Sequence, residues 1–477
     1  MHPTSTEPSA GLLFPLVAKR RIGGRSLNPT QLVSIGFFGL IVIGALALMM
    51  PFSSVTHTVT DPLTAIFTST SAVSLTGLTV VDTGGHWSTT GKIIIATLIQ
   101  LSGLGIMSLT SLAGMILTGR FGLRLRMNAA AEGRTLSIGD VKSTLIATLG
   151  FTALVEGAVT LMLASRFANK YGMSVDRAMG EGLFHAISSF NNAGFGLRKD
   201  NLVPYAADAW ILLPLAGSII IGGLGFPVLR ELITRLGIRV SRGWNWSNRD
   251  KRLGHLSVTS RLTLIGTAVL VLGGWLVIGV LEWNKALSGM PIGEKILTAF
   301  FQSVTPRTAG FNSVDYGQFH PSTLFITDIF MFIGGGSAGT AGGIKISTLL
   351  VLVAAMIAEF RGETDTVIGH RKISYSVVRQ AMTVFALGIM LVAVGVISLM
   401  LIENKFTGSQ ILFEVTSAFG TVGLTTGITP SLQGSSQIIL CFIMYLGRIG
   451  PITLVTALAG QDKARRFSYP EERPFIG

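Results

Sequence analysis

The sequence is poor in charged residues and nearly without cysteine. Only 13% of its 477 residues are Asp, Glu, Lys or Arg, against about 25% in an average soluble domain. So few charges could not cover the surface of a soluble protein of this length, and the 49% apolar content excludes a disordered chain. The one cysteine, Cys441, excludes a disulfide scaffold. An HExxH zinc motif and a Cys/His cluster are also missing, so we do not expect an enzyme.

Apolar residues gather instead in long runs with one charge or none. Residues 32–50 are 19 positions without a charge, which matches the roughly 20 residues that cross a bilayer as a helix. Two shorter pieces, 323–333 and 346–358, flank a Gly-rich stretch and count as one broken span. The other runs are 93–117, 143–164, 209–229, 262–281, 381–402 and 437–458. We therefore predict an all-α polytopic membrane protein with eight spans, because in lipid each backbone N–H and C=O must pair within its own segment.

Lys and Arg lie mostly on one side of these spans. The side with both termini holds 25 of the 37 basic and 11 of the 24 acidic residues, a net charge of +14. The positive-inside rule then places both termini in the cytoplasm, and the N-terminal segment shows no signal-peptide cleavage site. Nucleic-acid binding would need one basic patch, whereas this excess is split across five short pieces. We expect membrane lipid or an acidic partner protein, and no nucleic acid, as the partner.

Four similar segments lie between pairs of spans. Each begins with Phe, has Gly ten positions later and continues with an apolar residue. The Gly-to-Gly spacings are 117, 116 and 113 residues. The segments are 67–82 (FTSTSAVSLTGLTVVD), 184–200 (FHAISSFNNAGFGLRKD), 300–315 (FFQSVTPRTAGFNSVD) and 413–428 (FEVTSAFGTVGLTTGI). Repetition at a fixed period predicts four duplicated units, each made of a span, a short segment and a span.

The composition of the four segments favours a cation pore. The first part of each predicts a short helix of about eight residues, too short to span. The Gly-centred remainder predicts non-helical backbone, which at membrane depth must be buried in protein or line a water-filled cavity. Four such re-entrant loops would form a ring of carbonyls that replaces the hydration shell of an ion. LTGL, NAGF, TAGF and TVGL contain no acid, which favours a weakly hydrated monovalent cation. Loop punctuation or close helix packing is the alternative reading of these glycines.

The motifs TGLT, NAGF, TAGF and TVGLTTG, in this order between pairs of spans, resemble those of the Trk/Ktr/HKT superfamily of potassium transporters. The resemblance covers residues 27–460 and is nearest to the Ktr-type membrane subunits, the KtrB group. It implies a homodimer in the bacterial inner membrane, with one pore per subunit and a cytoplasmic ring of nucleotide-binding regulatory subunits. In this superfamily Gly at the first filter position favours potassium and Ser sodium, and the residue here is Gly77.

Three residues of each motif are the predicted K+ ligands. They are Leu75, Thr76 and Gly77; Asn192, Ala193 and Gly194; Thr308, Ala309 and Gly310; and Thr421, Val422 and Gly423. Backbone carbonyls would coordinate the ion, with the threonine hydroxyls as further candidates. Potassium is the expected substrate, a sodium requirement stays open, and no organic cofactor is expected.

A Gly-rich stretch interrupts the second span of the third unit. It has six glycines in residues 334–343, and each costs a helix about 1 kcal/mol relative to Ala. A dinucleotide-binding reading of its G-x-G-x-x-G match would need a βαβ unit, and a flexible kink is the other alternative. The resemblance implies a gate loop, with Gly334, Gly335, Gly336, Ser337, Ala338, Gly339, Thr340, Ala341, Gly342, Gly343 and Lys345 as gating residues.

Arg448 and Glu156 lie inside predicted spans, where a charge is costly and usually functional. The resemblance places Arg448 in the cavity under the filter, near the gate loop, as an electrostatic barrier; an ion pair or a snorkelling side chain is the alternative. For Glu156 we favour a pairing or packing role over ion handling. For His185 we favour a structural, hydrogen-bonded role.

The predicted organisation is an N-terminal cytoplasmic tail (1–28), four repeats (29–125, 140–240, 258–360 and 374–462) and a C-terminal cytoplasmic tail (463–477). The predicted function is potassium uptake through a channel-like pore. A sodium-selective relative, a secondary transporter driven by an ion gradient and the channel-like subunit of a potassium pump remain alternatives.

Overall fold

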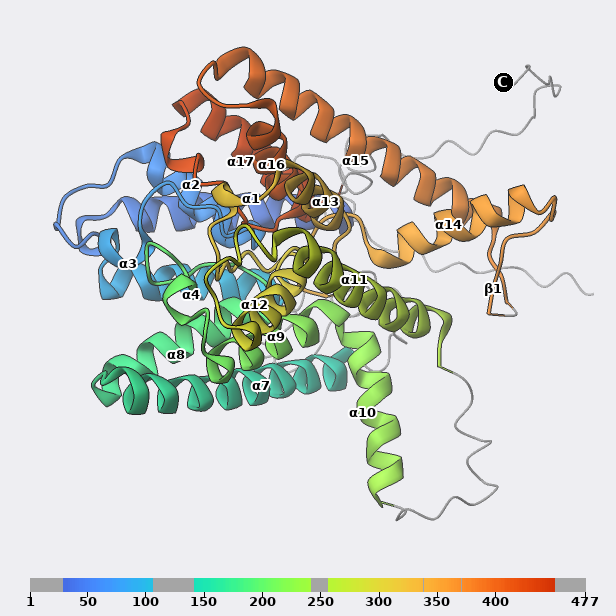
Figure 1. The fold of residues 1–477 in the computed structure, drawn as a ribbon, viewed down its shortest axis with the longest axis horizontal. Helices are drawn as coiled ribbons and strands as arrows, with labels where there is room; N and C mark the ends of the chain where they lie inside the picture. The colour runs from blue at the N-terminus through green and yellow to red at the C-terminus, as the bar shows by residue number, and fades with distance from the viewer. Residues whose placement is uncertain (1–28, 106–140, 242–255, 338, 370, 451–477) are drawn as a thin grey trace, which may run out of the picture.

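The described part of the chain is almost entirely helical. The computed structural model describes residues 29–105, 141–241, 256–337, 339–369 and 371–450. Within these ranges the one sheet is a hairpin of β1 (Val367–Ile368) and β2 (Arg371–Lys372). Figure 1 shows most helices gathered side by side, while the lower end of α10 (Phe226–Ser241) projects away from the others. The predicted mostly helical class is therefore confirmed.

The helices follow one order four times along the chain. A helix is followed by a shorter helix, a loop and then a second helix. The first set is α1 (Pro29–Met49), α2 (Pro62–Ser74) and α4 (Thr89–Gly103), and the second is α7 (Val141–Tyr171), α8 (Val175–Phe190) and α9 (Ala209–Leu224). The third set is α11 (Val258–Glu282), α12 (Ile292–Val304) and α13 (Pro321–Phe332), continued by α14 (Ile346–Phe360). The fourth is α15 (Tyr375–Ile402), α16 (Gly408–Gly420) and α17 (Gly434–Ile449), and the four-residue α3 (Thr83–His86) precedes α4.

Several of these helices have the length and composition of membrane spans. Among the described residues, Ile146–Tyr171, Val258–Glu282 and Tyr375–Ile402 are long and apolar enough to cross a bilayer. A fourth candidate is the pair Ala209–Leu224 and Phe226–Arg235, which bends by 104°. Shorter apolar helices are Ser34–Met49, Pro321–Phe332, Ile346–Phe360 and Gly434–Ile449. The predicted runs 93–117 and 437–458 extend beyond the described residues.

The short helices are longer than the sequence suggested. Instead of about eight residues, α2, α12 and α16 have 13 and α8 has 16. The prediction began each helix at its Phe, but all four helices start upstream of it, and α2 and α16 start just after residues that cap them with a side chain. Asp61 accepts a hydrogen bond from the Thr64 N–H ahead of Pro62, and Thr407 forms a capping box with Gln410. These caps satisfy N–H groups that the first turn leaves unpaired.

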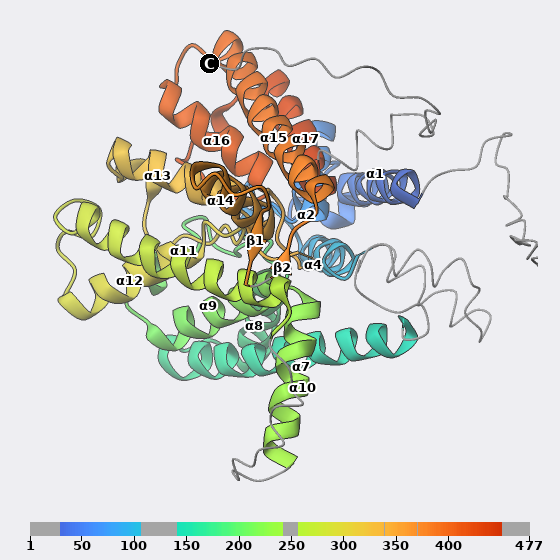
Figure 2. The same ribbon diagram turned by 90° about the vertical axis from the view of Figure 1, so that its right-hand side faces the viewer.

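The second helix of each set packs against the short helix of the next set. The packed pairs are α4 with α8, α9 with α12 and α13 with α16, and α17 packs against α2 of the first set. Figure 2 shows α17 close to α1 and α2, although they lie at opposite ends of the described chain. The four sets therefore close into a ring in chain order.

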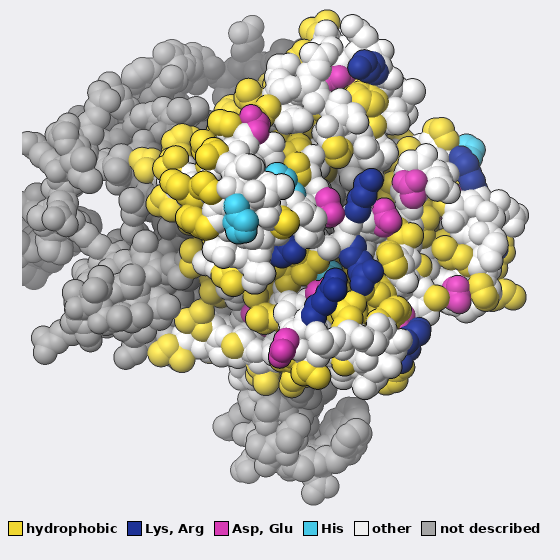
Figure 3. Space-filling view, turned by 90° about the vertical axis from the view of Figure 1, so that its left-hand side faces the viewer, with side chains coloured by type: hydrophobic (Ala, Val, Ile, Leu, Met, Phe, Trp, Pro, Cys, Tyr) yellow, Lys and Arg dark blue, Asp and Glu magenta, His cyan; other side chains and the backbone are white. Residues whose placement is uncertain are grey.

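One end of the bundle is polar. Figure 3 shows this end, where α3 lies in Figure 1, with acidic and basic side chains together toward its middle. Hydrophobic side chains lie at several of its margins. A surface of mixed charge at a helix end is expected to face water rather than lipid tails.

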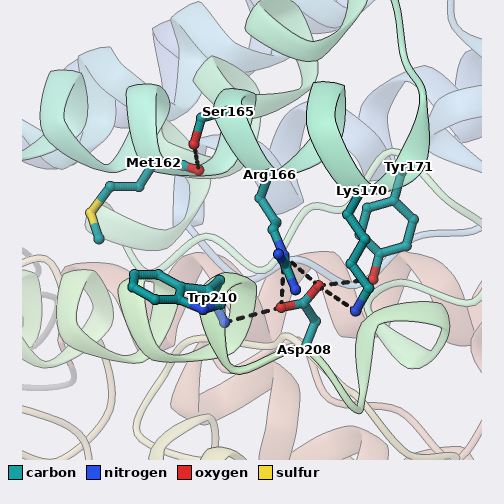
Figure 4. A network of polar contacts seen from close by, with 7 residues as sticks. All are labelled: Met162, Ser165, Arg166, Lys170, Tyr171, Asp208 and Trp210. Carbon is teal, nitrogen blue, oxygen red and sulfur yellow. Dashed lines mark hydrogen bonds and ion pairs between the residues drawn. The ribbon is translucent and has the colours of Figure 1, made fainter.

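At this end Asp208 joins the first and second helices of the second set (Figure 4). Its carboxylate accepts hydrogen bonds from Arg166 at 2.9 Å, Lys170 at 3.0 Å and Tyr171 at 3.2 Å, and it caps α9 through the Trp210 N–H. Burial raises the pKa of Asp208, but the hydrogen bonds from Arg166, Lys170 and the Trp210 N–H outweigh it and hold that pKa below its ordinary value. The cluster therefore stabilises the folded state only while Asp208 is charged.

We expect Asp208→Asn to lower the free energy of unfolding by about 2 kcal/mol at pH 7, because it removes two ion pairs from a buried acceptor. The depressed folded-state pKa means that the contribution is present above the unfolded value of about 3.9 and is lost below it. Thermal unfolding of the purified protein at pH 7 and at acidic pH measures this difference. The control Asp365→Asn breaks an exposed pair with Lys372 and should cost about 0.5 kcal/mol or less. Equal losses in the two variants would contradict the prediction.

Candidate functional site: a ring of four glycine segments

Each short helix leads into one predicted filter segment. The helices α2 and α16 end directly before their segments, α8 ends one residue earlier and α12 three residues earlier. The four segments have the same backbone conformation. The first residue of each has a positive φ, of 58° at Leu75, 56° at Asn192, 70° at Thr308 and 51° at Thr421. The glycine two positions later is also left-handed, with φ between 70° and 91°. Only six non-glycine residues of the described chain have a positive φ, and four of them stand here. Because this conformation costs an L-residue about 1–2 kcal/mol, its fourfold recurrence points to function.

The four glycines contact one another in chain order. A Cβ added to Gly77 would lie 2.5 Å from the carbonyl oxygen of Ala193, and one on Gly194 would lie 2.9 Å from that of Ala309. A Cβ on Gly310 would overlap the carbonyl of Val422. The same atom on Gly423 would overlap the carbonyl of Thr76, which closes the ring. Each glycine therefore leaves room for a carbonyl of the next segment, and no other residue type fits.

Backbone hydrogen bonds hold each segment to its short helix. The N–H groups of Thr76 and Val422 donate to Ser71 O and Ser417 O at 2.9 and 2.8 Å. The side chains of these serines also accept from the filter glycines: Gly77 N to Ser71 Oγ and Gly423 N to Ser417 Oγ, both at 3.0 Å. The first and fourth segments are therefore each held to their short helix by two hydrogen bonds to the same serine.

The second and third segments lack this serine contact. Ser188 holds the equivalent position in the second segment, but its hydroxyl has no partner among the described residues. In the third segment the position is Val304, which has no hydroxyl. A contact at 3.2 Å between the side chains of Asn192 and Thr308 joins these two segments to each other.

The electrostatics of the ring favour a cation. The C-terminal ends of α2, α8, α12 and α16 all lead into it, and the C-terminal end of a helix carries about half a negative charge. The residues of the four segments are fully or almost fully buried in protein and contain no charged side chain. The negative potential at the ring therefore comes from backbone carbonyls, from neutral side-chain oxygens such as those of the threonines, and from the ends of the short helices, and not from a carboxylate of the twelve residues.

The Gly-rich stretch between α13 and α14 is a non-helical loop packed against the ring. Its neck is closed by a parallel bridge between Ile333 and Ile344, with Gly334 N donating to Ile344 O at 2.7 Å. On one flank Gly336 N donates to Gly223 O at 2.8 Å, and the Thr340 hydroxyl lies 3.4 Å from Phe190 O at the end of α8. On the other flank, a Cβ on Gly342 would overlap the Thr421 side chain and one on Gly343 would lie 3.3 Å from Gly420 Cα. The loop therefore lies against both the second and the fourth segments.

Lys345 and Arg448 hold this loop. Lys345 Nζ donates to the carbonyls of Ala341 and Gly342, which keeps it within the loop. Arg448 Nη1 donates to Thr340 O, and its Nη2 donates to Ser102 O of α4 at 3.3 Å. One guanidinium thus joins the loop of the third set to a helix of the first set, which stands opposite in the ring. The loop therefore contacts the second and fourth sets directly and is linked to the first set through Arg448 of α17.

Gly335 and Gly339 of the loop pack against the end of α9, as does Gly336 through its hydrogen bond. Ser337 forms a hydroxyl contact with Ser347 at 2.9 Å. Ala338 lies outside the described residues, as do the predicted tails 1–28 and 463–477. His185 is buried with Nδ1 2.8 Å from Glu181 O, which agrees with a structural role.

Sequence reasoning missed the clamp around the fourth segment. Glu414 of α16 is fully buried, and its carboxylate accepts from the hydroxyls of Thr425 and Thr429 and from the Thr426 N–H at 3.1 Å. The sequence signal was an acidic residue within a short apolar helix, followed by three threonines. From the sequence we assigned ligand roles to carbonyls and threonine hydroxyls of the filter and no role to Glu414, but the clamp fixes the chain as it leaves the filter.

Comparisons with known proteins agree with this geometry. The chain matches the TrkH family of cation transport proteins over residues 10–467. It is 38% identical to the Ktr system potassium uptake protein B of Bacillus subtilis, across 94% of this chain and 97% of that protein. It is 35% identical to the potassium/sodium uptake protein NtpJ of Enterococcus hirae, across 97% and 100% of the two chains. The crystal structure of the potassium transporter TrkH from Vibrio parahaemolyticus has the same fold, with a TM-score of 0.69 at 18% identity over 92% of this chain and 87% of that one.

The apolar helices and the family match define a multi-pass membrane transport protein, not an enzyme. Within that class, the chain belongs to the TrkH family of cation transport proteins.

Proposed function

We propose that this protein takes up potassium through a pore framed by the four glycine segments. The observation that carries the proposal is the closed ring in which each filter glycine faces a carbonyl of the next segment. Carbonyls held at fixed positions can replace the water around a weakly hydrated cation. The names of the relatives, which are potassium uptake proteins, support the same substrate.

The proposed architecture has four pseudo-symmetric repeats and eight spans around the pore, with both termini in the cytoplasm. The ring of helix contacts in chain order supports the four repeats. The basic residues on the terminal side support the orientation. In this orientation the polar end with α3 and Asp208 faces outward.

We assign the roles within the pore as follows. Carbonyls of the four segments bind K+, and the ends of the four short helices stabilise its charge. The loop at 334–343, held by Arg448 and Lys345, obstructs the pore below the filter and moves when the pore opens. Arg448 adds a fixed positive charge to that barrier, since cations crossing the cavity must pass its guanidinium.

The names of the relatives support a proposal on how transport is regulated and whether it depends on sodium. Two are Ktr system potassium uptake proteins of Bacillus subtilis, which supports a cytoplasmic regulatory partner of the Ktr kind and a membrane homodimer. NtpJ is named for potassium and sodium, so sodium dependence belongs to the proposal and sodium transport is its competitor.

Rescue of a bacterium deficient in potassium uptake, at limiting potassium with and without sodium, tests the proposal. Wild-type protein should restore growth, and Gly77→Ser should lower the K+/Na+ uptake ratio about tenfold or more, equivalent to about 1.4 kcal/mol. The physical reason is that a side chain at Gly77 must displace the Ala193 carbonyl. Absence of rescue by wild-type protein that is present in the membrane would refute the proposal, and rescue that tracks sodium alone would favour the competitor.

A further inference from the structure

Glu156 lies inside α7, and its carboxylate meets two amides. It is 7% exposed. Gln100 Nε2 of α4 donates to one carboxylate oxygen, and Asn191 Nδ2 donates to the other, both at 3.1 Å. Asn191 Nδ2 is also 2.8 Å from Gln100 Oε1, which closes a triangle of three side chains. No Lys, Arg or His of the described chain forms an ion pair with Glu156.

Asn191 connects this triangle to the ring. It is the C-terminal cap of α8 and directly precedes Asn192, the first residue of the second filter segment. Its amide is also 2.9 Å from Ile187 O in the last turn of α8. A Cβ on Gly103 of α4 would overlap Asn191 Oδ1, so α4 also packs directly against the Asn191 amide. The end of α8 is therefore fixed from outside by α4 and α7.

The second segment needs this external anchor. In the first and fourth segments a serine hydroxyl binds the N–H of the filter glycine, but Ser188 makes no such bond. Asn191 holds the position that Ser74 and Gly420 hold in the first and fourth segments, and neither of those is bound by a carboxylate in the described residues. Removal of the carboxylate would leave Gln100 Nε2 without its acceptor and would free Asn191 Nδ2 to bond only Gln100 Oε1 and Ile187 O. An unpaired buried donor costs more than the bond itself contributes.

We propose that Glu156 is a positioning residue of the filter: through Asn191 it fixes the end of α8 and, with it, the carbonyls of Asn192–Gly194. This inference rests on the proposed potassium pore. The carboxylate is suited to the task because it only accepts hydrogen bonds, whereas a glutamine would turn an N–H₂ group toward one of two donors. A displaced segment would change the ion site more than it changes the fold.

The test measures potassium and sodium uptake against ion concentration in the full chain, in the uptake-deficient bacterium. We expect Glu156→Gln to raise the KM for potassium about tenfold, with a smaller change in maximal rate and a lower K+/Na+ ratio. The double variant Glu156→Gln with Asn191→Asp exchanges the two groups, so that residue 191 carries the carboxylate and residue 156 the amide. It should recover most of the loss, to within about threefold of wild type.

The matched control is Glu282→Gln. Glu282 is another fully buried glutamate that accepts from two backbone N–H groups, His320 N and Ala286 N, and neither donor is a filter residue or the residue before one. It should lower thermal stability and leave the K+/Na+ ratio unchanged. An equal shift of that ratio in the control would overturn the inference, because it would then reflect general damage.

Unchanged KM and selectivity in Glu156→Gln, at normal membrane levels, would also overturn it. If that variant does not accumulate, Gln100→Met removes one corner of the triangle while keeping its size, and the same criterion applies to it. Wild-type protein without potassium uptake would instead refute the proposed function, so the two failures are distinguishable.

Discussion

Gly423→Ala is expected to reduce potassium uptake at least about 100-fold, equivalent to about 2.8 kcal/mol. The backbone φ of Gly423 is 91°, which alanine avoids, and its new Cβ would overlap the carbonyl of Thr76. The fourth segment would have to move away from the first. Because both segments are pinned by serines, the movement would open the ring rather than be absorbed. Initial rates of potassium uptake, normalised to protein in the membrane, measure the effect.

Gly427→Ala is the matched control for this experiment. Gly427 has a similar φ of 89°, but nothing lies within 4 Å of a Cβ built on it. It therefore reproduces the backbone strain without the collision, and should lower stability while keeping most of the uptake. If both variants lose uptake equally, backbone strain explains the loss in both. The close approach of the first and fourth segments would then not be needed to explain the effect of Gly423→Ala.

Deletion of residues 335–342 is expected to raise potassium uptake about tenfold in cells without a regulatory partner, if the open state of the intact loop is populated at about 10%. The deletion removes the part of the loop that reaches Thr421, Phe190 and Arg448. The neck residues Ile333 and Ile344 already pair, so the two ends lie close enough to rejoin. Uptake rates with and without the deletion, at equal membrane levels, test the obstruction directly.

Arg448→Ala should act in the same direction with a smaller effect, because it releases the loop from α4 without shortening it. Arg379→Ala, on an exposed position of α15, is the control for removal of one arginine and should leave uptake unchanged. Unchanged or lower uptake in the deletion variant, at normal expression, would argue against an obstructing loop.

The positions of the four filter segments could be predicted from the sequence, because each segment requires a particular residue type, glycine, at a fixed position. Gly at a constant distance from Phe, four times, marks places where the backbone must come close to something. Helix class and the interruption after Phe332 followed in the same way, from apolar runs and from clustered glycines. The structure places all twelve predicted filter residues in one ring, and their role in ion binding stays a prediction.

Other parts of the site could not be predicted, because they depend on which helices become neighbours. The contact of Arg448 with Thr340 joins residues 108 apart in the chain, and its contact with Ser102 joins residues 346 apart. Nothing local in the sequence specifies such pairs. The serine contacts were within reach, since Ser71, Ser188 and Ser417 all stand six positions before a filter glycine. The sequence could not show which of these serines bind the glycine N–H, because Ser188 is also a serine and yet its hydroxyl makes no hydrogen bond among the described residues.

The closure of the ring by Gly423 has a consequence for biogenesis. The carbonyl of Thr76 is synthesised early, but Gly423, the residue that packs against it, is synthesised 347 positions later. Until α16 and its segment emerge, the ring of the first three segments has an open side. Under the proposed function, a nascent chain at this stage has no complete pore through which ions could leak, because the contacts that close the ring join residues far apart in the sequence.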